Sequence, residues 1–253
     1  MYDVATGLVP VQELALHDVP VDTAGELADL VVAGRYVPAG AGLEPIAGDF
    51  YDLLALQPDL LAIVVGDVSG HGLGAASRMH QLRAATRAHA FQQPGPRSLL
   101  ARLDTFMDLV HDESLATLWY GEYQPSTGRL TYSSAGHPPP VLTCHGEQTQ
   151  LLELASSPPL GTGVAHRLAQ DHVVELPPGA VLVAYSDGLV ERHDTDLDDQ
   201  LALLQSIVTA SCDPATITSA HDIATEIMDA LVPEPERAED DVCLLVVRRQ
   251  PQG

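Results

Sequence analysis

The chain has 253 residues, with 12 arginines, no lysine and 35 acidic residues, which gives a formal net charge of −23. Such a surface repels nucleic-acid phosphates and anionic lipids, so neither nucleic-acid binding nor membrane binding is expected. The sequence shows no apolar run of the roughly 20 residues that a membrane span needs, no signal peptide and three cysteines without metal-type spacing, which together predict a cytoplasmic protein.

The beginning of the chain has a mixed composition. Residues 1–34 contain scattered prolines and acids and are expected to form an N-terminal extension, followed by one domain over residues 35–250. The apolar stretch over residues 30–37 is a candidate first strand. We find no low-complexity linker or internal repeat that would divide the chain further.

Two apolar runs then predict a β-hairpin. Residues 50–56 and 60–66 flank the turn Gln57-Pro58-Asp59. Asp49 and Asp67 lie equally far from this turn, so antiparallel pairing should bring their carboxylates together at the open end of the hairpin. Two like charges in one place destabilise each other unless protons or a cation intervene.

A helix pair is expected after the hairpin. The first helix covers residues 72–91, and the second covers residues 97–110 after Pro94-Gly95-Pro96. Apolar or small side chains recur at helical spacing on one face of the first helix. They are Ala75, Met79, Leu82, Thr86 and Ala90.

The remainder of the chain predicts more strands and a second helix pair. The strands are expected at residues 117–123, 129–133, 141–143, 151–154, 172–176, 180–185 and 242–247, and the helices at residues 198–210 and 218–231. Strands and helix pairs in this order, with antiparallel connections, predict an α+β fold with helices packed on sheet faces.

Three of the expected strands are wholly apolar and carry acid at one end. The acid follows the first two strands, as Asp67 and Asp187, and precedes the third, as Asp240 and Asp241. If the third strand is antiparallel to the other two, these acids gather at one edge of the core, and the hairpin adds Asp49.

Several carboxylates in one place, without lysine, indicate a site for hard divalent cations. Carboxylate oxygens and water suit Mg²⁺ or Mn²⁺, whereas zinc prefers cysteine and histidine. Two such ions can bind a phosphoryl oxygen and ionise a water for in-line attack. A single Asp-Gly is more often a turn or a helix cap, but four aspartates at strand ends favour a metal site.

Short motifs follow one another along the chain. They are Ala47-Gly48-Asp49-Phe50-Tyr51-Asp52, Gly66-Asp67-Val68-Ser69-Gly70-His71-Gly72, Ser134-Ala135-Gly136-His137-Pro138-Pro139, Pro158 with Leu160-Gly161, Tyr185-Ser186-Asp187-Gly188-Leu189-Val190-Glu191, and Asp240-Asp241-Val242. In this order they resemble the SpoIIE/RsbU-type branch of the metal-dependent serine/threonine protein phosphatases, the PPM family. The resemblance covers residues 35–248.

The resemblance implies a four-layer αββα sandwich, in which two antiparallel sheets are flanked by helix pairs, and two Mn²⁺ or Mg²⁺ ions at one edge of it. The metal-binding positions that it implies are Asp49, Asp67, Val68 through its carbonyl, Asp187, Asp240 and, where the family tolerates Asp or Asn, Asp241. Asp67 matches the carboxylate that bridges the two ions. The catalytic positions are then Asp67 and Asp187, together with His71.

Other singled-out residues have competing interpretations. His71 could assist proton transfer near the metals or could contact the backbone of its turn. His137 is expected to be structural, because the prolines after it fix a bend. Arg35 and Arg78 could hold a substrate phosphate, with a plain surface position as the alternative for each.

Two other functions compete with the phosphatase. Gly70-His71-Gly72-Leu73-Gly74-Ala75 partly fits the dinucleotide-binding fingerprint, but Asp67 would repel a pyrophosphate and the expected downstream acid is missing. A catalytically silent binding or regulatory module with the PPM fold would keep the acids without turnover, and absence of metal binding would favour it.

We therefore expect a Mn²⁺- or Mg²⁺-dependent phosphatase that hydrolyses phosphoserine or phosphothreonine by attack of a metal-bound water. The resemblance suggests a bacterial anti-sigma-factor antagonist as the phosphoprotein partner.

Overall fold

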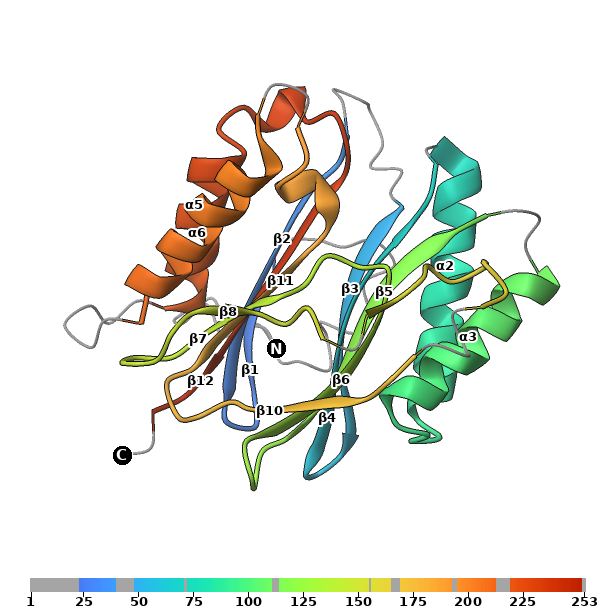
Figure 1. The fold of residues 1–253 in the computed structure, drawn as a ribbon, viewed down its shortest axis with the longest axis horizontal. Helices are drawn as coiled ribbons and strands as arrows, with labels where there is room; N and C mark the ends of the chain where they lie inside the picture. The colour runs from blue at the N-terminus through green and yellow to red at the C-terminus, as the bar shows by residue number, and fades with distance from the viewer. Residues whose placement is uncertain are drawn as a thin grey trace, which may run out of the picture. The chain divides into compact units, whose positions relative to one another are not determined.

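The computed structural model describes residues 23–39, 48–70, 72–110, 114–154, 156–164, 169–192, 195–212 and 219–251. The chain forms two compact units. Unit 1 comprises Met1–Leu43, Pro140–Leu152 and Leu176–Gly253, and unit 2 comprises Glu44–Pro139 and Glu153–Glu175. In each unit, the described residues form one sheet with a pair of helices on one of its faces (Figure 1).

Unit 2 contains the predicted hairpin and the first helix pair. Its strands are β3 (Asp49–Gln57), β4 (Leu60–Val68), β5 (Ala116–Gln124), β6 (Arg129–Ala135), β9 (Ser156–Ser157) and β10 (His172–Glu175), and its helices are α2 (Gly72–Ala90) and α3 (Pro96–Val110). The order is β10-β6-β5-β4-β3, with all of these pairs antiparallel and β9 paired in parallel with β6. The short β9 is an addition that the sequence analysis did not predict.

Helix α2 packs on its sheet through the predicted face. The five side chains expected there, Ala75, Met79, Leu82, Thr86 and Ala90, are all buried. This burial follows from the helical period, because residues three and four positions apart lie on the same side of a helix.

A buried ion-pair cluster also ties α2 to strand β3. Asp52 on β3 has a fully buried side chain. Arg83 donates to Asp52 Oδ1 from Nε at 3.1 Å and from Nη2 at 2.8 Å. Arg87 donates from Nε to Oδ2 at 2.8 Å and from Nη2 to Oδ1 at 2.7 Å. Two arginines one helical turn apart therefore hold one carboxylate.

Unit 1 contains the other two apolar runs and the second helix pair. Its strands are β1 (Thr23–Leu27), β2 (Leu30–Val37), β7 (Val141–Thr143), β8 (Gln150–Leu151), β11 (Val181–Tyr185) and β12 (Val242–Arg249), and its helices are α5 (Leu197–Ala210) and α6 (Ala220–Leu231). Short 3-10 helices are η1 (Asp187–Leu189) and η2 (Pro235–Arg237). The strand order is β1-β2-β12-β11-β7-β8, with antiparallel pairing throughout.

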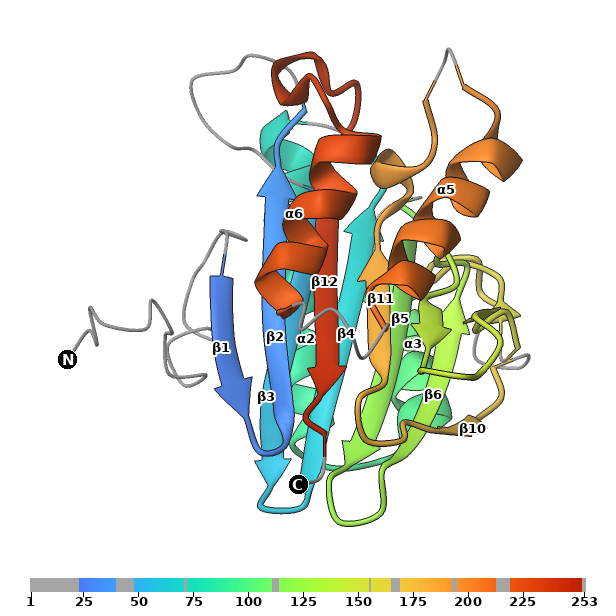
Figure 2. The same ribbon diagram turned by 90° about the vertical axis from the view of Figure 1, so that its left-hand side faces the viewer.

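The sheet of unit 1 and its helices share one apolar core. Helix α6 lies across β2 and β12 (Figure 2). Side chains such as Val183 and Val246 from the strands pack with Leu204 of α5 and with Ile223 and Ile227 of α6. Helix α6 begins at a capping box, in which Ser219 and Asp222 satisfy each other's backbone N–H groups.

Antiparallel pairing of β12 with β11 meets the expected condition for these two strands, so Asp187 lies near Asp240 and Asp241, whereas β4 belongs to the sheet of unit 2 and the gathering of Asp49 and Asp67 with them stays a prediction. Val181 pairs with Arg248 and Tyr185 with Leu244, so the C-terminal end of β11 lies beside the N-terminal end of β12. The predicted strand over residues 30–37 is β2, and β1 adds residues 23–27 to the same sheet. The division into an extension and a domain remains a prediction.

The α+β class, with two sheets flanked by helix pairs, is confirmed by these elements. Among the described residues, every helix is too short or too polar to cross a lipid bilayer.

Candidate metal-binding carboxylates

The open end of the β3–β4 hairpin brings Asp49 opposite Asp67, as the sequence predicted. Asp49 is buried and Asp67 is half-buried. The backbone before Asp49 packs closely against the end of β4: Val68 donates its N–H to the Gly48 carbonyl at 3.1 Å. A Cβ on Gly48 would lie 2.6 Å from the Val68 carbonyl oxygen and 3.2 Å from Asp67 Oδ1. Both oxygens therefore lie against the backbone of Gly48, and only glycine leaves room for them there.

The chain just beyond Val68 is held by the start of β5. Ser69 donates its N–H to the Leu115 carbonyl at 3.0 Å, and its hydroxyl accepts the N–H of Leu115 at 3.2 Å. Thr117 pairs directly with Asp67 across the sheet, and the Thr117 hydroxyl lies 2.8 Å from Nδ1 of the buried His137. The structural role expected for His137 stays a prediction.

A buried carboxylate on α3 supports the same region from the other side. Asp104 has no exposed surface, and its Oδ1 accepts the N–H of Gly161 at 2.9 Å. The preceding Leu160 exchanges two backbone hydrogen bonds with Ala116, at 2.8 and 3.2 Å. Hydrogen bonds therefore link α3 to the Leu160–Gly161 loop and this loop to the start of β5. The residue just before β5, Leu115, in turn forms hydrogen bonds with Ser69.

In unit 1, Asp187 is the first residue of η1, immediately after β11. The pairing of β11 with β12 continues one residue further, to Ser186. Its backbone N–H donates to the Cys243 carbonyl at 2.9 Å, and its side-chain Oγ accepts the Cys243 N–H at 2.8 Å. A Cβ on Gly188 would lie 2.2 Å from the Asp241 carbonyl oxygen and 3.3 Å from Asp240 Cβ. The turn after Asp187 therefore packs directly on the two acids that open β12.

Burial and mutual repulsion both act on the acids of unit 1. Burial raises the pKa of Asp187, and the nearby Glu191 raises it further. Burial likewise raises the pKa of Asp240, and the charges of Asp187 and Asp241 add to the effect. Carboxylates that resist ionisation in each other's presence are stabilised when a cation is added. The neighbouring Asp241 is buried and accepts the N–H of Ala39 at 2.8 Å.

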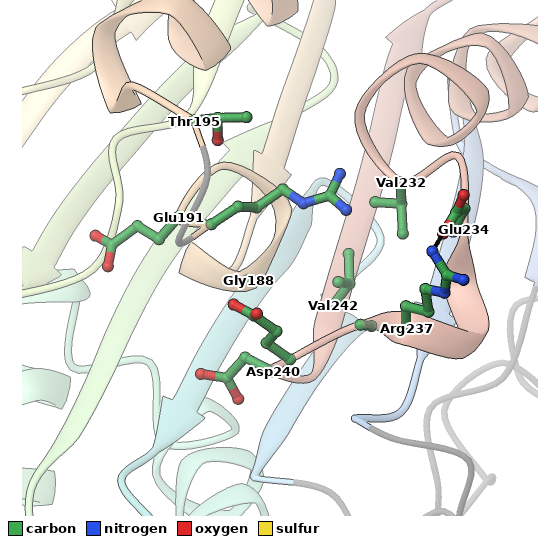
Figure 3. A pocket seen from close by; sticks show the side chains of 11 residues that line it. Gly188, Glu191, Thr195, Val232, Glu234, Arg237, Asp240 and Val242 are labelled. Atoms are coloured by element: carbon green, nitrogen blue, oxygen red, sulfur yellow. Dashed lines mark ion pairs between the residues drawn. The ribbon is translucent and has the colours of Figure 1, made fainter.

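A pocket of about 370 Å³ lies beside Gly188 and Asp240 in unit 1 (Figure 3). Its wall includes Glu191, Thr195, Val232, Glu234, Arg237 and Val242. Arg237 forms an ion pair with Glu234. Arg192 also lines the pocket and donates to the Leu231 carbonyl, one of the last carbonyls of α6, at 2.5 Å.

The oxygen donors fit Mg²⁺ or Mn²⁺ by their chemistry. Unit 2 supplies two carboxylates and a backbone carbonyl, and unit 1 supplies the carboxylates of Asp187 and Asp240, with no thiol or imidazole in either set. In the described ranges, no three His, Cys, Asp or Glu side chains form a ready metal-binding cluster. The predicted ligand set therefore stays a prediction, and His71 lies outside the described residues.

Several supporting residues were missed by the sequence analysis. Gly48 and Ser186 belong to the motifs of the acids. The close packing of Gly48 against Val68 and Asp67, and the hydrogen bonds of Ser186 with Cys243, were not predicted. The burial of Asp104 could have been predicted from the sequence, because it is a lone acid on the apolar helix face formed by Leu100, Leu103 and Met107.

The two sheets and their helix pairs match the fold of a PP2C-type phosphatase domain, that of SpoIIE from Bacillus subtilis, with a TM-score of 0.73 at 18% identity, covering 88% of this chain and 64% of that one. Residues 57–250 match the family model described as Stage II sporulation protein E (SpoIIE). The chain therefore belongs to the SpoIIE family.

Individual relatives agree with this family. The chain is 26% identical over 219 residues to Protein IcfG of Synechocystis, covering 75% of this chain and 33% of that protein. It is 25% identical over 215 residues to the phosphoserine phosphatase RsbP of Bacillus subtilis, covering 80% of this chain and 49% of that protein. The chain thus spans between a third and half of the length of these relatives.

Solved structures show the same fold. The RsbU and RsbW domains of a Mycobacterium tuberculosis protein superpose with a TM-score of 0.78 at 30% identity, covering 94% of this chain and 65% of that one. Two structures of lower identity, 16% and 18%, contain magnesium in one case and two manganese ions in the other, and they show likeness of fold alone.

Proposed function

We propose that the protein is a Mn²⁺- or Mg²⁺-dependent phosphatase that hydrolyses phosphoserine or phosphothreonine in a partner protein. The observation that carries the proposal is the pairing of Asp49 with Asp67 at the open end of the hairpin, where the Val68 carbonyl and Asp67 Oδ1 both lie close to Gly48. Membership of the SpoIIE family supports it.

The proposed ligands of two metal ions are the oxygens at the strand ends. They are the carboxylates of Asp49, Asp67, Asp187 and Asp240, the carbonyl of Val68 and, with its carboxylate already engaged by Ala39, Asp241. Bound ions would neutralise these acids, polarise the phosphoryl group and lower the pKa of a water at the site.

The chain's own residues have holding and proton-transfer roles in this proposal. The backbone of Asp67 is held between β3 and β5, which keeps its carboxylate at the end of the hairpin beside Asp49. Asp187 is fixed at the first position of η1. We assign proton transfer to His71, because an imidazole titrates near neutral pH. Water would attack phosphorus in line and the seryl or threonyl oxygen would leave, with no covalent enzyme intermediate.

The proposed partner is a phosphorylated anti-sigma-factor antagonist. Support comes from the names of similar proteins: RsbP is a phosphoserine phosphatase, and the M. tuberculosis structure joins RsbU and RsbW domains. We place the reaction in the cytoplasm, because Cys144, Cys212 and Cys243 are all free thiols, as a reducing compartment would keep them.

The test measures phosphate release from a phosphoserine peptide while Mn²⁺ is titrated into the wild-type protein and into Asp67→Asn. The matched control is Asp59→Asn, which changes a partly exposed aspartate at the turn end of the same hairpin, whose carboxylate accepts hydrogen bonds from Ser126. Mn²⁺ binding is measured separately by isothermal titration calorimetry.

Mn²⁺-dependent turnover that Asp67→Asn abolishes and Asp59→Asn leaves intact is the expected result. Mn²⁺ binding without turnover would indicate an enzyme that needs an activating partner. Absence of both turnover and Mn²⁺ binding would refute the proposal and leave the silent binding module as the function.

A further inference from the structure

Arg78 has an unusual environment near the start of α2. Its side chain lies back over the end of the helix, where two glycines leave it room. A Cβ on Gly74 would be 3.4 Å from Nη1 and 3.9 Å from Nη2, and a Cβ on Gly70 would be 3.6 Å from Nη2. Gly70 also has a positive φ of 101°, which a side chain would strain. The guanidinium is therefore placed against the loop that leaves β4 just after Val68.

This guanidinium has no protein partner in the part of the chain that the structure describes. Its Nε is shielded from solvent and makes no hydrogen bond there. The next two arginines on the same helix, Arg83 and Arg87, both donate to Asp52. A buried donor without an acceptor is uncommon in folded proteins and calls for an explanation.

A bound anion would satisfy the guanidinium. The Nε and one Nη of an arginine form a flat edge that donates two parallel hydrogen bonds, a geometry that matches phosphate oxygens. With 35 acidic residues against 12 arginines, the chain as a whole repels a phosphomonoester dianion, so local positive charge is needed where the substrate binds. Arg78 offers that charge at the loop adjoining Asp67 and Val68.

We propose that Arg78 binds the phosphoryl oxygens of the substrate phosphomonoester. This inference rests on the proposed function, because it takes the carboxylates beside this loop to be the reacting site. It makes Arg78 a substrate-binding residue and supplies its guanidinium with an acceptor that the described residues do not provide. The same chemistry would also hold inorganic phosphate, the product.

The test compares Arg78→Gln and Arg78→Lys with the wild type. Arg97→Gln is the matched control, since Arg97 is exposed and the hydrogen bond to Asp171 comes from its backbone N–H. Three quantities are measured: kcat and KM for a phosphoserine peptide, the dissociation constant of inorganic phosphate by calorimetry, and the dissociation constant of Mn²⁺. Thermal melting verifies that each variant is folded.

Loss of a charge-assisted contact should weaken phosphate binding by about 10- to 100-fold in Arg78→Gln and lower kcat/KM by a similar factor. Arg78→Lys should recover part of both, because it restores the charge without the bidentate edge. Mn²⁺ binding should be unchanged or slightly tighter, since one positive charge is removed near the cation site. The Arg97→Gln control should match the wild type.

Unchanged phosphate binding and kcat/KM in a folded Arg78→Gln would overturn the inference. Weaker phosphate binding with unchanged kcat/KM would refute the substrate role and identify free phosphate as the ligand. If the wild type neither turns over substrate nor binds Mn²⁺, the proposed function fails. The phosphate titration still tests the inference about Arg78 in that case, and phosphate binding that is equally strong in Arg78→Gln would refute that inference.

Discussion

Removing the carboxylate of Asp52 should be the most damaging single change to the polar core of unit 2. Asp52 has a fully buried side chain and accepts four hydrogen bonds, two from Arg83 and two from Arg87. The Arg83 side chain is 5% exposed and that of Arg87 is 28% exposed. Substitution to alanine would remove the carboxylate that accepts two hydrogen bonds from the buried guanidinium of Arg83 and two from the half-buried guanidinium of Arg87.

The expected loss follows from this geometry. Breaking a buried ion pair by removing one partner costs about 3–5 kcal/mol, most of it from the uncompensated charge. That is a large part of the roughly 5–15 kcal/mol by which a typical domain is stable. Arg83 carries most of the cost because it cannot reach water, whereas Arg87 can rotate outwards. The matched control is Asp59→Ala, whose partly exposed carboxylate accepts hydrogen bonds from Ser126, so its removal should cost much less.

Urea denaturation followed by circular dichroism measures both variants against the wild type. We expect the free energy of unfolding to fall by about 3–5 kcal/mol in Asp52→Ala and to change little in Asp59→Ala. Replacing Asp52 and Arg83 together by leucine and methionine should recover part of the loss, because apolar residues of similar size often substitute well for a buried pair. A loss below about 1 kcal/mol in Asp52→Ala would refute the assignment of a buried network.

Three further predictions concern the acids and their supports. Because the pKa of Asp240 is raised in the folded state, the stability of the metal-free protein should fall as pH rises through the range in which carboxylates ionise. Asp240→Asn should therefore raise the melting temperature measured at neutral pH in EDTA, and it should remove the stabilisation by Mn²⁺. An unchanged increase in melting temperature on adding Mn²⁺ would contradict this prediction. Gly188→Ala should lower the free energy of unfolding by about 1–3 kcal/mol, measured in urea, because its Cβ would meet the Asp241 carbonyl at 2.2 Å. Asp104→Ala should lower the melting temperature and weaken Mn²⁺ binding, as calorimetry would show, whereas the exposed Asp108→Ala should do neither.

The features that the sequence predicted most accurately are those that depend on segments close together along the chain. The pairing of Asp49 with Asp67 followed from the position of the Pro58 turn, and the hairpin has that register. The buried face of α2 followed from helical spacing. In both cases, the residues that decide the structure lie within one hairpin or one helix, so a local pattern contains the whole argument.

Contacts between distant segments could not be predicted in the same way. Strand β3 is buried along its first six positions, so no alternation marks Asp52 as an acid that points toward α2. Its partners, Arg83 and Arg87, are equally compatible with an exposed helix face. The bond from Asp104 to Gly161 joins segments that no periodicity relates. Such pairs become visible only when the packing of helix on sheet is known.

The glycines of the two acid-bearing motifs have a common physical reason. In unit 2, glycine precedes the acid, and a Cβ on Gly48 would lie 2.6 Å from the Val68 carbonyl oxygen. In unit 1, glycine follows the acid, and a Cβ on Gly188 would lie 2.2 Å from the Asp241 carbonyl oxygen. Antiparallel strands place the two chain segments of each pair side by side. Because glycine has no Cβ, the backbone of Gly48 can pack against the Val68 carbonyl, and that of Gly188 can pack against the Asp241 carbonyl. The Gly-Asp and Asp-Gly pairs therefore indicate a close approach of two backbone segments, and within each unit the acids lie where that approach occurs.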